Sequence, residues 1–426
     1  MPDLNKLTLL EAFQGLREGK FTSRELTQDC FNQIKKFDDK VKAFITLNEE
    51  EAFDQADTFD AKFKTGENLP PLAGIPVIIK DIFCTKGLKT TAASKILADY
   101  VPPFDAEAIR RLREQGAVFL GKVNLDEFAM GGSTENSGFF PTHNPWDLER
   151  VPGGSSGGSA AALAADMGIY ALGTDTGGSI REPASFCGVS GLKVSYGRVS
   201  RYGVMAMTSS LDTIGPFAKS VEDLALILKY IAGRDVKDST TPDLPVDDYS
   251  QEIKKEIKGL KIGLPKEYFV EGMDEGVREI VLTAAKKLEE MGAEVFDISL
   301  PHTDLAVAAY YIICPCEVSS NLARYDGIRY GLSKRDDNDF WSIYLNSRAE
   351  GLGAEVKRRI MIGTYALSAG YYDAYYKKAM QIRTLVRQDF DEAFKEVDVI
   401  LTPVAPTTAY KSVSYTHLTL PTIYSV

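Results

Sequence analysis

Serine and glycine gather in one short part of the chain, between Pro152 and Arg181. A Gly-Gly-Ser-Ser-Gly-Gly-Ser run at 153–159 enters an alanine-rich helical pattern, and a second turn, Asp-Thr-Gly-Gly-Ser, follows an apolar segment at 175–179. Glycine permits unusual dihedral angles and close approach, so main-chain amides can converge there on a small site. Flexible loops are the ordinary alternative, but two independent linkers would not be expected to flank one helix and one strand so tightly.

Phosphate binding and serine–histidine catalysis both fit this block poorly. A Walker-type phosphate loop needs a lysine after its last glycine, whereas Ser159 follows Gly158 here. The chain has 3 histidines, at 143, 302 and 417. None of them lies in a context typical of a serine protease. A serine nucleophile in this chain therefore needs a different base.

Lysine can replace histidine as the base if burial among apolar groups keeps it neutral near pH 7. Lys80 ends the apolar segment Gly-Ile-Pro-Val-Ile-Ile-Lys, where an unused amine would be costly to bury. A lysine at a strand end more often simply reaches solvent. If Lys80 is the base, we expect it to be buried, with a pKa lowered by desolvation before any effect of neighbouring charge.

These segments resemble the amidase signature family in sequence and in spacing, with 75 residues from Lys80 to Ser155 and 24 from Ser155 to Ser179. The resemblance implies that Ser179 is the nucleophile, Ser155 the bridging serine and Lys80 the general base, joined by hydrogen bonds. It also implies a cis Gly154–Ser155 peptide bond. The fold expected from it is α/β, with a central mixed β-sheet covered by helices on both faces. Main-chain amides would form the oxyanion hole, from Thr176, Gly177, Gly178 and Ser179.

Within this family, segments 124–147, 197–217 and 355–376 are similar to A subunits of glutamyl-tRNA(Gln) amidotransferases, and the similarity runs from the first helix to Pro406. It implies that the chain hydrolyses glutamine and supplies ammonia for the conversion of Glu-tRNA(Gln) to Gln-tRNA(Gln). The expected partners are the B and C subunits. ATP and Mg²⁺ would be used by the partner protein, which would also hold most of the tRNA, and this chain would need no cofactor or metal.

The same similarity assigns glutamine binding to Arg359 and Tyr310. An arginine fork suits the α-carboxylate of glutamine because it can bind both oxygens. The ordinary alternative for Arg359 is an exposed helix arginine, since Arg358 adjoins it.

Two other functions stay open. The chain could be a stand-alone amidase acting on another small carboxamide. It could also be an inactive, truncated assembly protein, because the similarity stops at 408–411 and the sequence of 413–418 matches one reading frame of a transposon adaptor. Residues 411–426 are therefore predicted to be a non-native tail.

The remaining sequence predicts the elements that position these residues. Residues 1–70 form a helical N-terminal layer, with a capping box at Thr22 and Glu25, and 71–410 form the amidase-signature α/β domain. A polar loop is expected at 234–252. The strand–helix–strand pattern that follows it could add to the same sheet, before long helices at 304–396 and a last strand.

Composition limits what the chain can bind. It has 426 residues and a net charge of −11, so it would repel a nucleic-acid backbone. The 5 cysteines have no metal-ligand spacing, which favours reduced thiols. No signal peptide is evident, and no run approaching the ~20 apolar residues of a membrane span is evident either. We expect a cytoplasmic protein that does not enter the membrane.

Overall fold

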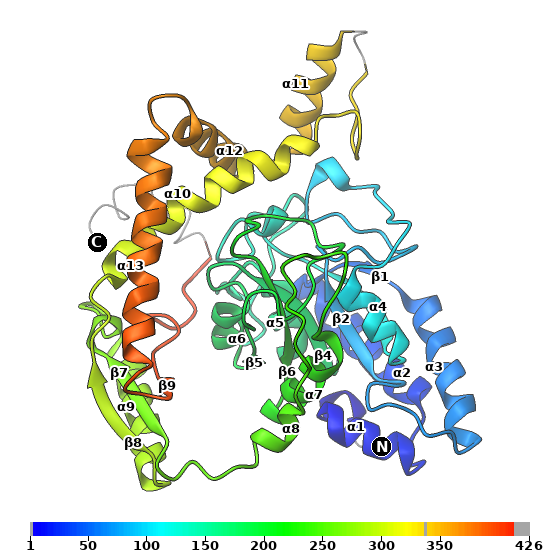
Figure 1. Ribbon diagram of the computed structural model, residues 1–426. Coiled ribbons are helices and arrows are strands. Elements are labelled where there is room, and N and C mark those ends of the chain that lie inside the picture. Colours follow the sequence, from blue (N-terminus) through cyan, green and yellow to red (C-terminus); the bar gives the residue numbers. More distant parts are fainter. Residues whose placement is uncertain (1–2, 336–338, 413–426) are drawn as a thin grey trace. The chain divides into compact units, whose positions relative to one another are not determined.

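The computed structural model describes residues 3–335 and 339–412 (Figure 1). The chain divides into two compact units, each built from segments that are distant in the sequence. Unit 1 comprises Met1–Ile253, Ala323–Lys357 and Ala409–Val426, and unit 2 comprises Lys254–Leu322 and Arg358–Thr408. These units group the chain differently from the predicted segments 1–70 and 71–410.

Unit 1 contains a six-stranded sheet and its helices. The strands are β1 (Phe44–Leu47), β2 (Pro76–Lys80), β3 (Val118–Val123), β4 (Tyr170–Asp175), β5 (Ser190–Gly191) and β6 (Thr213–Ala218). The helices are α1 (Leu9–Arg17), α2 (Ser23–Val41), α3 (Glu49–Lys64), α4 (Glu107–Glu114), α5 (Gly157–Ala164), α6 (Arg181–Cys187), α7 (Val221–Ile231), α8 (Tyr249–Glu252) and α11 (Phe340–Gly351). Helix α12 (Ala354–Leu367) begins in this unit and continues into unit 2.

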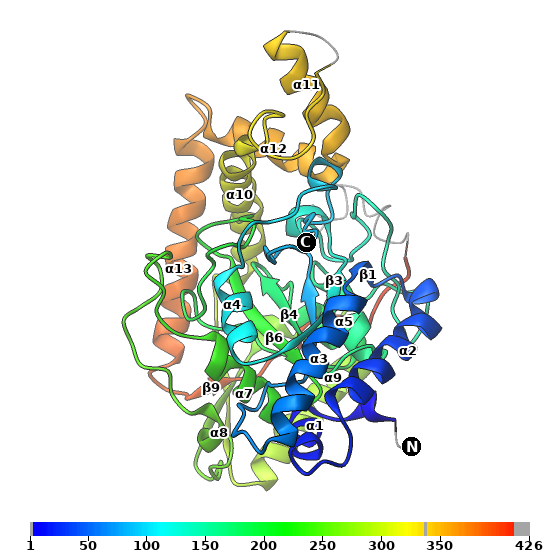
Figure 2. The same cartoon turned by 90° about the vertical axis from the view of Figure 1, so that its right-hand side faces the viewer.

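The sheet has the strand order β1-β3-β2-β4-β6-β5. Strand β2 is parallel to both β3 and β4, whereas the pairs β1–β3, β4–β6 and β5–β6 are antiparallel, so the sheet is mixed. Every residue of β2, β3, β4 and β6 is buried, which requires cover on both faces. Helices α2, α3, α5 and α7 contact these strands (Figure 2). The predicted mixed α/β fold is confirmed.

This topology brings three chain segments to one edge of the sheet. Because β2 and β4 are parallel, their carboxyl ends, Lys80 and Asp175, lie at the same edge. Strand β6 runs the other way and begins there, with Thr213 opposite Asp175. The second glycine-rich turn therefore leaves the sheet beside the first residues of β6.

The N-terminal helices begin where the sequence predicts. Thr22 accepts a hydrogen bond from the Glu25 amide and Glu25 accepts one from the Thr22 amide, which completes the predicted capping box of α2. Thr8 and Glu11 form a second capping box at α1. Together these bonds satisfy main-chain donors that the first turn of each helix leaves unpaired.

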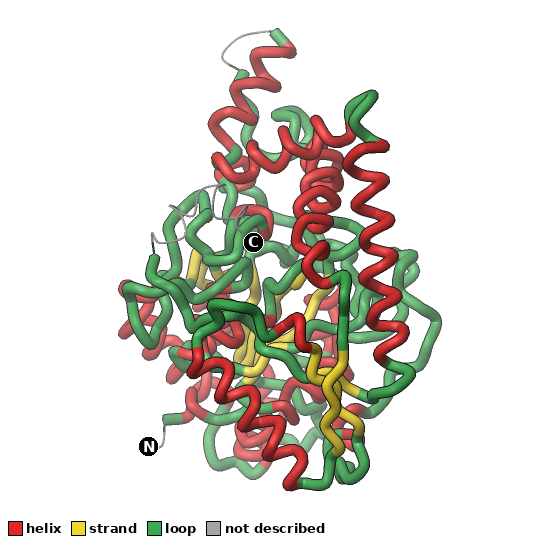
Figure 3. The backbone as a smooth tube through the Cα atoms, turned by 90° about the vertical axis from the view of Figure 1, so that its left-hand side faces the viewer, coloured by secondary structure: helices red, strands yellow, loops and turns green. Residues whose placement is uncertain are grey.

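Unit 2 has a sheet of its own, so the prediction that these strands add to the main sheet was wrong (Figure 3). Strand β7 lies between β8 and β9 and is parallel to both. Its partners occupy both edges of β7, so no edge of that strand is left to pair with β1 or β5. The elements of unit 2 are β7 (Lys261–Pro265), α9 (Glu275–Glu290), β8 (Glu294–Ile298), α10 (Thr303–Asn321), a π-helical turn (Asp373–Lys377), α13 (Lys378–Ala393) and β9 (Val399–Ile400).

Among the described residues, one helical segment is long and apolar enough to cross a membrane by length and composition alone. This segment is Thr303–Arg324, which includes α10, and Asp304 and Glu317 interrupt it, so it is not the unbroken apolar run that the sequence lacks. Part of α10 is packed inside the protein, including Ile313 and Val318, and the helix contacts α13. A core helix passes the same test, so this segment is weak evidence for a membrane.

The predicted non-native tail lies mostly outside the described residues, which end at 412. Lys411 forms an isolated β-bridge with Arg150, and the Ser412 hydroxyl donates to Glu135 at 2.7 Å. The predicted loop at 234–252 contains the buried residues Asp235 and Asp238 and ends in the short helix α8.

Candidate active site

The Lys80 side chain, at the end of β2, is fully buried (0% exposed). Its Nζ lies within hydrogen-bond distance of three hydroxyl oxygens: 2.9 Å from Ser155 Oγ, 2.8 Å from Ser156 Oγ and 2.8 Å from Thr174 Oγ1. The predicted contact between Lys80 and Ser155 is therefore present. The contacts with Ser156 and Thr174 were not predicted.

Burial lowers the pKa of Lys80 to about 7, against an opposing attraction from the carboxylates of Asp126, Asp175 and Asp212. Desolvation disfavours the ammonium form and is the larger effect, as the sequence predicts. The adjoining carboxylate, Asp81, lies 3.5 Å from the amine of another lysine, Lys122. A substantial fraction of Lys80 is therefore a neutral amine near pH 7.

The hydroxyls around Lys80 can accommodate this neutral form. The Ser156 hydroxyl donates to the Thr174 carbonyl at 3.1 Å, so its oxygen can accept from Lys80. A neutral amine has two N–H donors and one lone pair. If these donors are directed at Ser156 and Thr174 Oγ1, the lone pair faces the Ser155 hydroxyl. Lys80 can then take a proton from Ser155.

Ser155 is held by the loop that precedes α5. The Gly154–Ser155 peptide bond is cis, as the resemblance implies. The Asp126 amide donates to the Ser155 carbonyl at 3.3 Å. A side chain at Gly154 would place Cβ 2.2 Å from Asp126 Oδ2, so only glycine fits there. The Ser155 side chain is completely buried.

Ser179 lies in the turn after β4 and is 7% exposed. Its carbonyl accepts a hydrogen bond from the Ser156 amide at 3.2 Å, which ties the two glycine-rich segments together. The second predicted link, between the hydroxyls of Ser155 and Ser179, is not among the hydrogen bonds formed by the described residues. The structure thus brings the two serines to one region but does not complete the predicted relay.

Asp175 organises the turn that carries Ser179. Its carboxylate accepts from the amides of Gly178 at 2.8 Å and Ile180 at 3.0 Å, and it pairs with the Arg181 guanidinium at 2.9 Å. These interactions lower the pKa of Asp175 although burial opposes them. Gly178 has φ +131°, which a residue with a side chain adopts only with strain. Asp175 is a site residue that the sequence reasoning missed.

The oxyanion-hole prediction needs one correction. The Gly178 amide already donates to Asp175, so it is not available to a substrate oxygen. Within the described part of the chain, the amides of Thr176, Gly177 and Ser179 donate to no protein acceptor. These three amides remain candidates for binding an oxyanion.

The predicted glutamine-binding residues lie in unit 2, whereas Lys80 and both serines lie in unit 1. Arg359 is buried, and its Nη1 is 3.9 Å from Cys314 Sγ. Tyr310 belongs to this cluster, since burial, then Cys314, raises its pKa while the Arg359 charge opposes the rise. The alternative of an exposed helix arginine is wrong for Arg359. In the described residues, no group of three or more His, Cys, Asp or Glu side chains is arranged to hold a metal ion.

A mixed α/β sheet that buries a neutral lysine against serine hydroxyls is an arrangement suited to amide hydrolysis by a serine nucleophile. The Amidase family matches residues 25–425, nearly the whole chain. The chain belongs to the amidase family.

The chain is similar to several A subunits of glutamyl-tRNA(Gln) amidotransferases and, at lower identity, to a peptide amidase. The chain is 56% identical over 409 residues to the A subunit of glutamyl-tRNA(Gln) amidotransferase from Moorella thermoacetica, covering 96% of this chain and 84% of that protein. It is 55% identical, with the same coverage, to the A subunit from Carboxydothermus hydrogenoformans. Among solved structures, the A subunit from Thermotoga maritima matches with a TM-score of 0.80 and 44% identity, over 100% of this chain and 84% of that one. Peptide amidase from Stenotrophomonas maltophilia matches with a TM-score of 0.79 and 30% identity, over 96% and 87% of the two chains.

Proposed function

We propose that this chain is the glutamine-hydrolysing A subunit of a glutamyl-tRNA(Gln) amidotransferase. The observation that supports it most is the buried Lys80 amine, 2.9 Å from Ser155, in a chain 56% identical to an A subunit over nearly its full length. The alternative of a stand-alone amidase is supported less, because the peptide amidase is only 30% identical.

The proposed reaction begins at Ser179. Its Oγ attacks the side-chain carbonyl carbon of glutamine, while its proton passes to Ser155 and the proton of Ser155 passes to neutral Lys80. This relay needs a side-chain rotation or a bound substrate to close the Ser155–Ser179 link. Catalytic hydrogen bonds often tighten only when substrate is bound.

The tetrahedral intermediate carries a negative oxygen, for which the amides of Thr176, Gly177 and Ser179 are the proposed donors. Its collapse breaks the carbon–nitrogen bond, and the departing nitrogen takes a proton back through the relay and leaves as ammonia. Water then attacks the glutamyl ester, giving glutamate and restoring the Ser179 hydroxyl. In this second step the relay accepts a proton from the attacking water and returns one to Ser179 Oγ, so Lys80 gains and loses one proton in each of the two steps and ends the turnover unchanged.

The proposed partners follow from the same assignment. Ammonia would pass to the B subunit, which would use ATP and Mg²⁺ to activate Glu-tRNA(Gln), and a C subunit would complete a cytoplasmic heterotrimer. The net charge of −11 supports a division of labour in which tRNA is held mainly by the partner. Tyr310 and Arg359 are the proposed glutamine-binding residues of this chain.

The test is ammonia release from glutamine by the purified chain, alone and with B and C subunits. We expect release that increases with the partners and prefers glutamine over aliphatic and aryl amides. Preference for another carboxamide, independent of partners, would support the stand-alone amidase. A chain that stabilises the complex but releases no ammonia would support the inactive assembly protein.

A further inference from the structure

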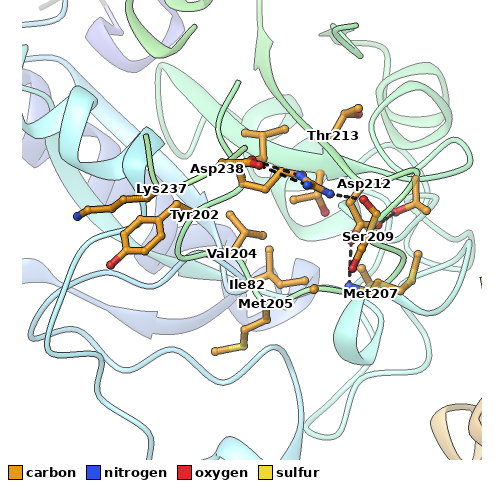
Figure 4. Close-up of a pocket in the computed structure, with 16 residues that line it drawn as sticks. Ile82, Tyr202, Val204, Met205, Met207, Ser209, Asp212, Thr213, Lys237 and Asp238 are labelled. Carbon is orange, nitrogen blue, oxygen red and sulfur yellow. Dashed lines mark hydrogen bonds and ion pairs between the residues drawn. The ribbon is translucent and has the colours of Figure 1, made fainter. Parts of the chain in front are cut away.

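Asp212 lies immediately before β6, at the sheet edge where β4 ends in the turn that carries Ser179. With Thr176 it lines a pocket of about 210 Å³ (Figure 4). No step of the proposed reaction uses this carboxylate, and nothing in the sequence singled it out.

Both oxygens of the Asp212 carboxylate accept hydrogen bonds. The Thr176 hydroxyl donates to Oδ1 at 2.7 Å, and the amides of Met207 and Thr208 each donate to Oδ2 at 2.9 Å. Burial raises the pKa of Asp212 to about 6, so the group is mostly ionised at pH 7.5 and can accept all three bonds. The carboxylate therefore connects the Ser179 turn to the loop that precedes β6.

The same loop also contacts the chain that follows Lys80. The Met205 amide donates to the Ile82 carbonyl at 3.2 Å, and the Cys84 amide donates to the Gly203 carbonyl at 2.9 Å. Residues 203–212 are thus bonded at one end to the segment after the proposed base and at the other to the turn with the proposed nucleophile.

We propose that Asp212 is a positioning residue for the proposed amide hydrolysis, acting by holding Thr176 so that the Thr176 amide is directed at the oxyanion. The inference rests on the proposed function. Thr176 opens a glycine-containing turn, and the 2.7 Å bond to Asp212 anchors its side chain. Because the oxyanion exists only after attack, loss of this anchor should lower kcat and leave KM nearly unchanged.

The variants Asp212→Ala, Thr176→Val and their combination test the inference by steady-state ammonia release. We expect each single change to lower kcat about 10- to 100-fold. This loss should not exceed the one caused by removing an oxyanion donor altogether, because the Thr176 amide is still present. KM should stay within about threefold, and the double variant should be no worse than Asp212→Ala alone, since both remove one interaction. Thr176→Ser keeps the hydroxyl and should restore most of kcat.

Asp235→Asn is a matched control, because Asp235 also accepts from one serine hydroxyl, that of Ser200 at 2.6 Å, and from one amide. None of its hydrogen bonds with the described residues reaches the Ser179 turn. We expect a lower melting temperature with kcat unchanged.

Three outcomes would overturn the inference: a kcat for Asp212→Ala within twofold of the wild-type value, losses that multiply in the double variant, or an equal loss of kcat in Asp235→Asn. If Asp212→Ala does not fold, the Thr176→Val and Thr176→Ser pair decides by the same criteria. A wild-type chain that hydrolyses no amide would instead overturn the proposed function itself.

Discussion

The Nζ of Lys80 lies 2.9 Å from the Oγ of Ser155, and both side chains are completely buried. The pKa of this lysine is about 7, so the amine can accept a proton from the hydroxyl beside it at physiological pH. Proton transfer at this distance needs no movement of either residue. The proposed mechanism depends on this pair for its base.

Activity should depend on pH through Lys80. The neutral amine is the active form, so kcat/KM should rise with pH and level off above an apparent pKa near 7. Below that pH the protonated lysine cannot accept a proton, and the rate should fall about tenfold per unit. A pH profile of kcat/KM for ammonia release measures this dependence. A value of kcat/KM that does not fall between pH 7 and pH 5 would exclude Lys80 as the base.

The same pKa predicts how stability changes with pH. Lys80 titrates near 7 when folded and near its ordinary value of 10.5 when unfolded, so the unfolded chain binds more protons between these values. Stability relative to Lys80→Met should therefore rise with pH across this window, by up to about 1.4 kcal/mol per unit, and be constant below pH 7. Denaturant unfolding of both proteins at pH 6, 8 and 9.5 gives the difference. A difference that stays flat from pH 6 to pH 9.5 would mean that folding does not lower the pKa of Lys80.

Ser156 should matter for catalysis although the sequence analysis assigns it no role. Ser156→Ala removes an acceptor that orients the Lys80 amine, and we expect kcat to fall about tenfold or more through misplacement of the base. Ser159→Ala is the matched control, because Ser159 is also buried and its hydroxyl donates to the Leu172 carbonyl at 3.0 Å, away from Lys80. Equal kcat values for the two variants would show that Ser156 is merely structural.

Arg359 should act on binding. Arg359→Lys keeps the charge but loses the fork that can hold both carboxylate oxygens, so we expect KM for glutamine to rise about tenfold or more with a smaller change in kcat. Arg358→Lys, one residue away, should leave KM unchanged. Isothermal titration calorimetry should show weaker glutamine binding by Arg359→Lys than by Arg358→Lys. Equal affinities for the two variants would exclude Arg359 from the glutamine site.

The resemblance to the amidase signature family assigns Lys80, Ser155 and Ser179, and it can do so because the segments that carry it are short and local in the sequence. Lys80 ends an apolar segment, and both serines lie in glycine-rich runs. Ser156 and Thr174 were missed because their role depends on the pairing of β2 with β4, which no local pattern records. Thr174 lies inside an ordinary strand pattern.

Contacts between segments distant in the sequence also explain most of the other features that the sequence did not predict. Asp212 meets the Ser179 turn only because β4 pairs antiparallel with β6, from a segment 36 residues further along the chain than Thr176. Asp175, by contrast, bonds that turn locally, because it directly precedes it. The second sheet could not be predicted for the same reason as Asp212. The residues of β7 have the pattern of any apolar strand, and only the pairing of β7 with β8 and β9 places it in a separate sheet.

The proposed mechanism requires that glutamine acylates Ser179. Mass spectrometry of the acid-quenched protein during turnover, alone and in complex with its partners, followed by peptide mapping, detects this acyl-enzyme. We predict one glutamyl group on the peptide that contains Ser179, absent in Ser179→Ala, which should also release ammonia at least about 10³-fold more slowly. An adduct on a different residue, or ammonia release at the wild-type rate by Ser179→Ala, would contradict the mechanism.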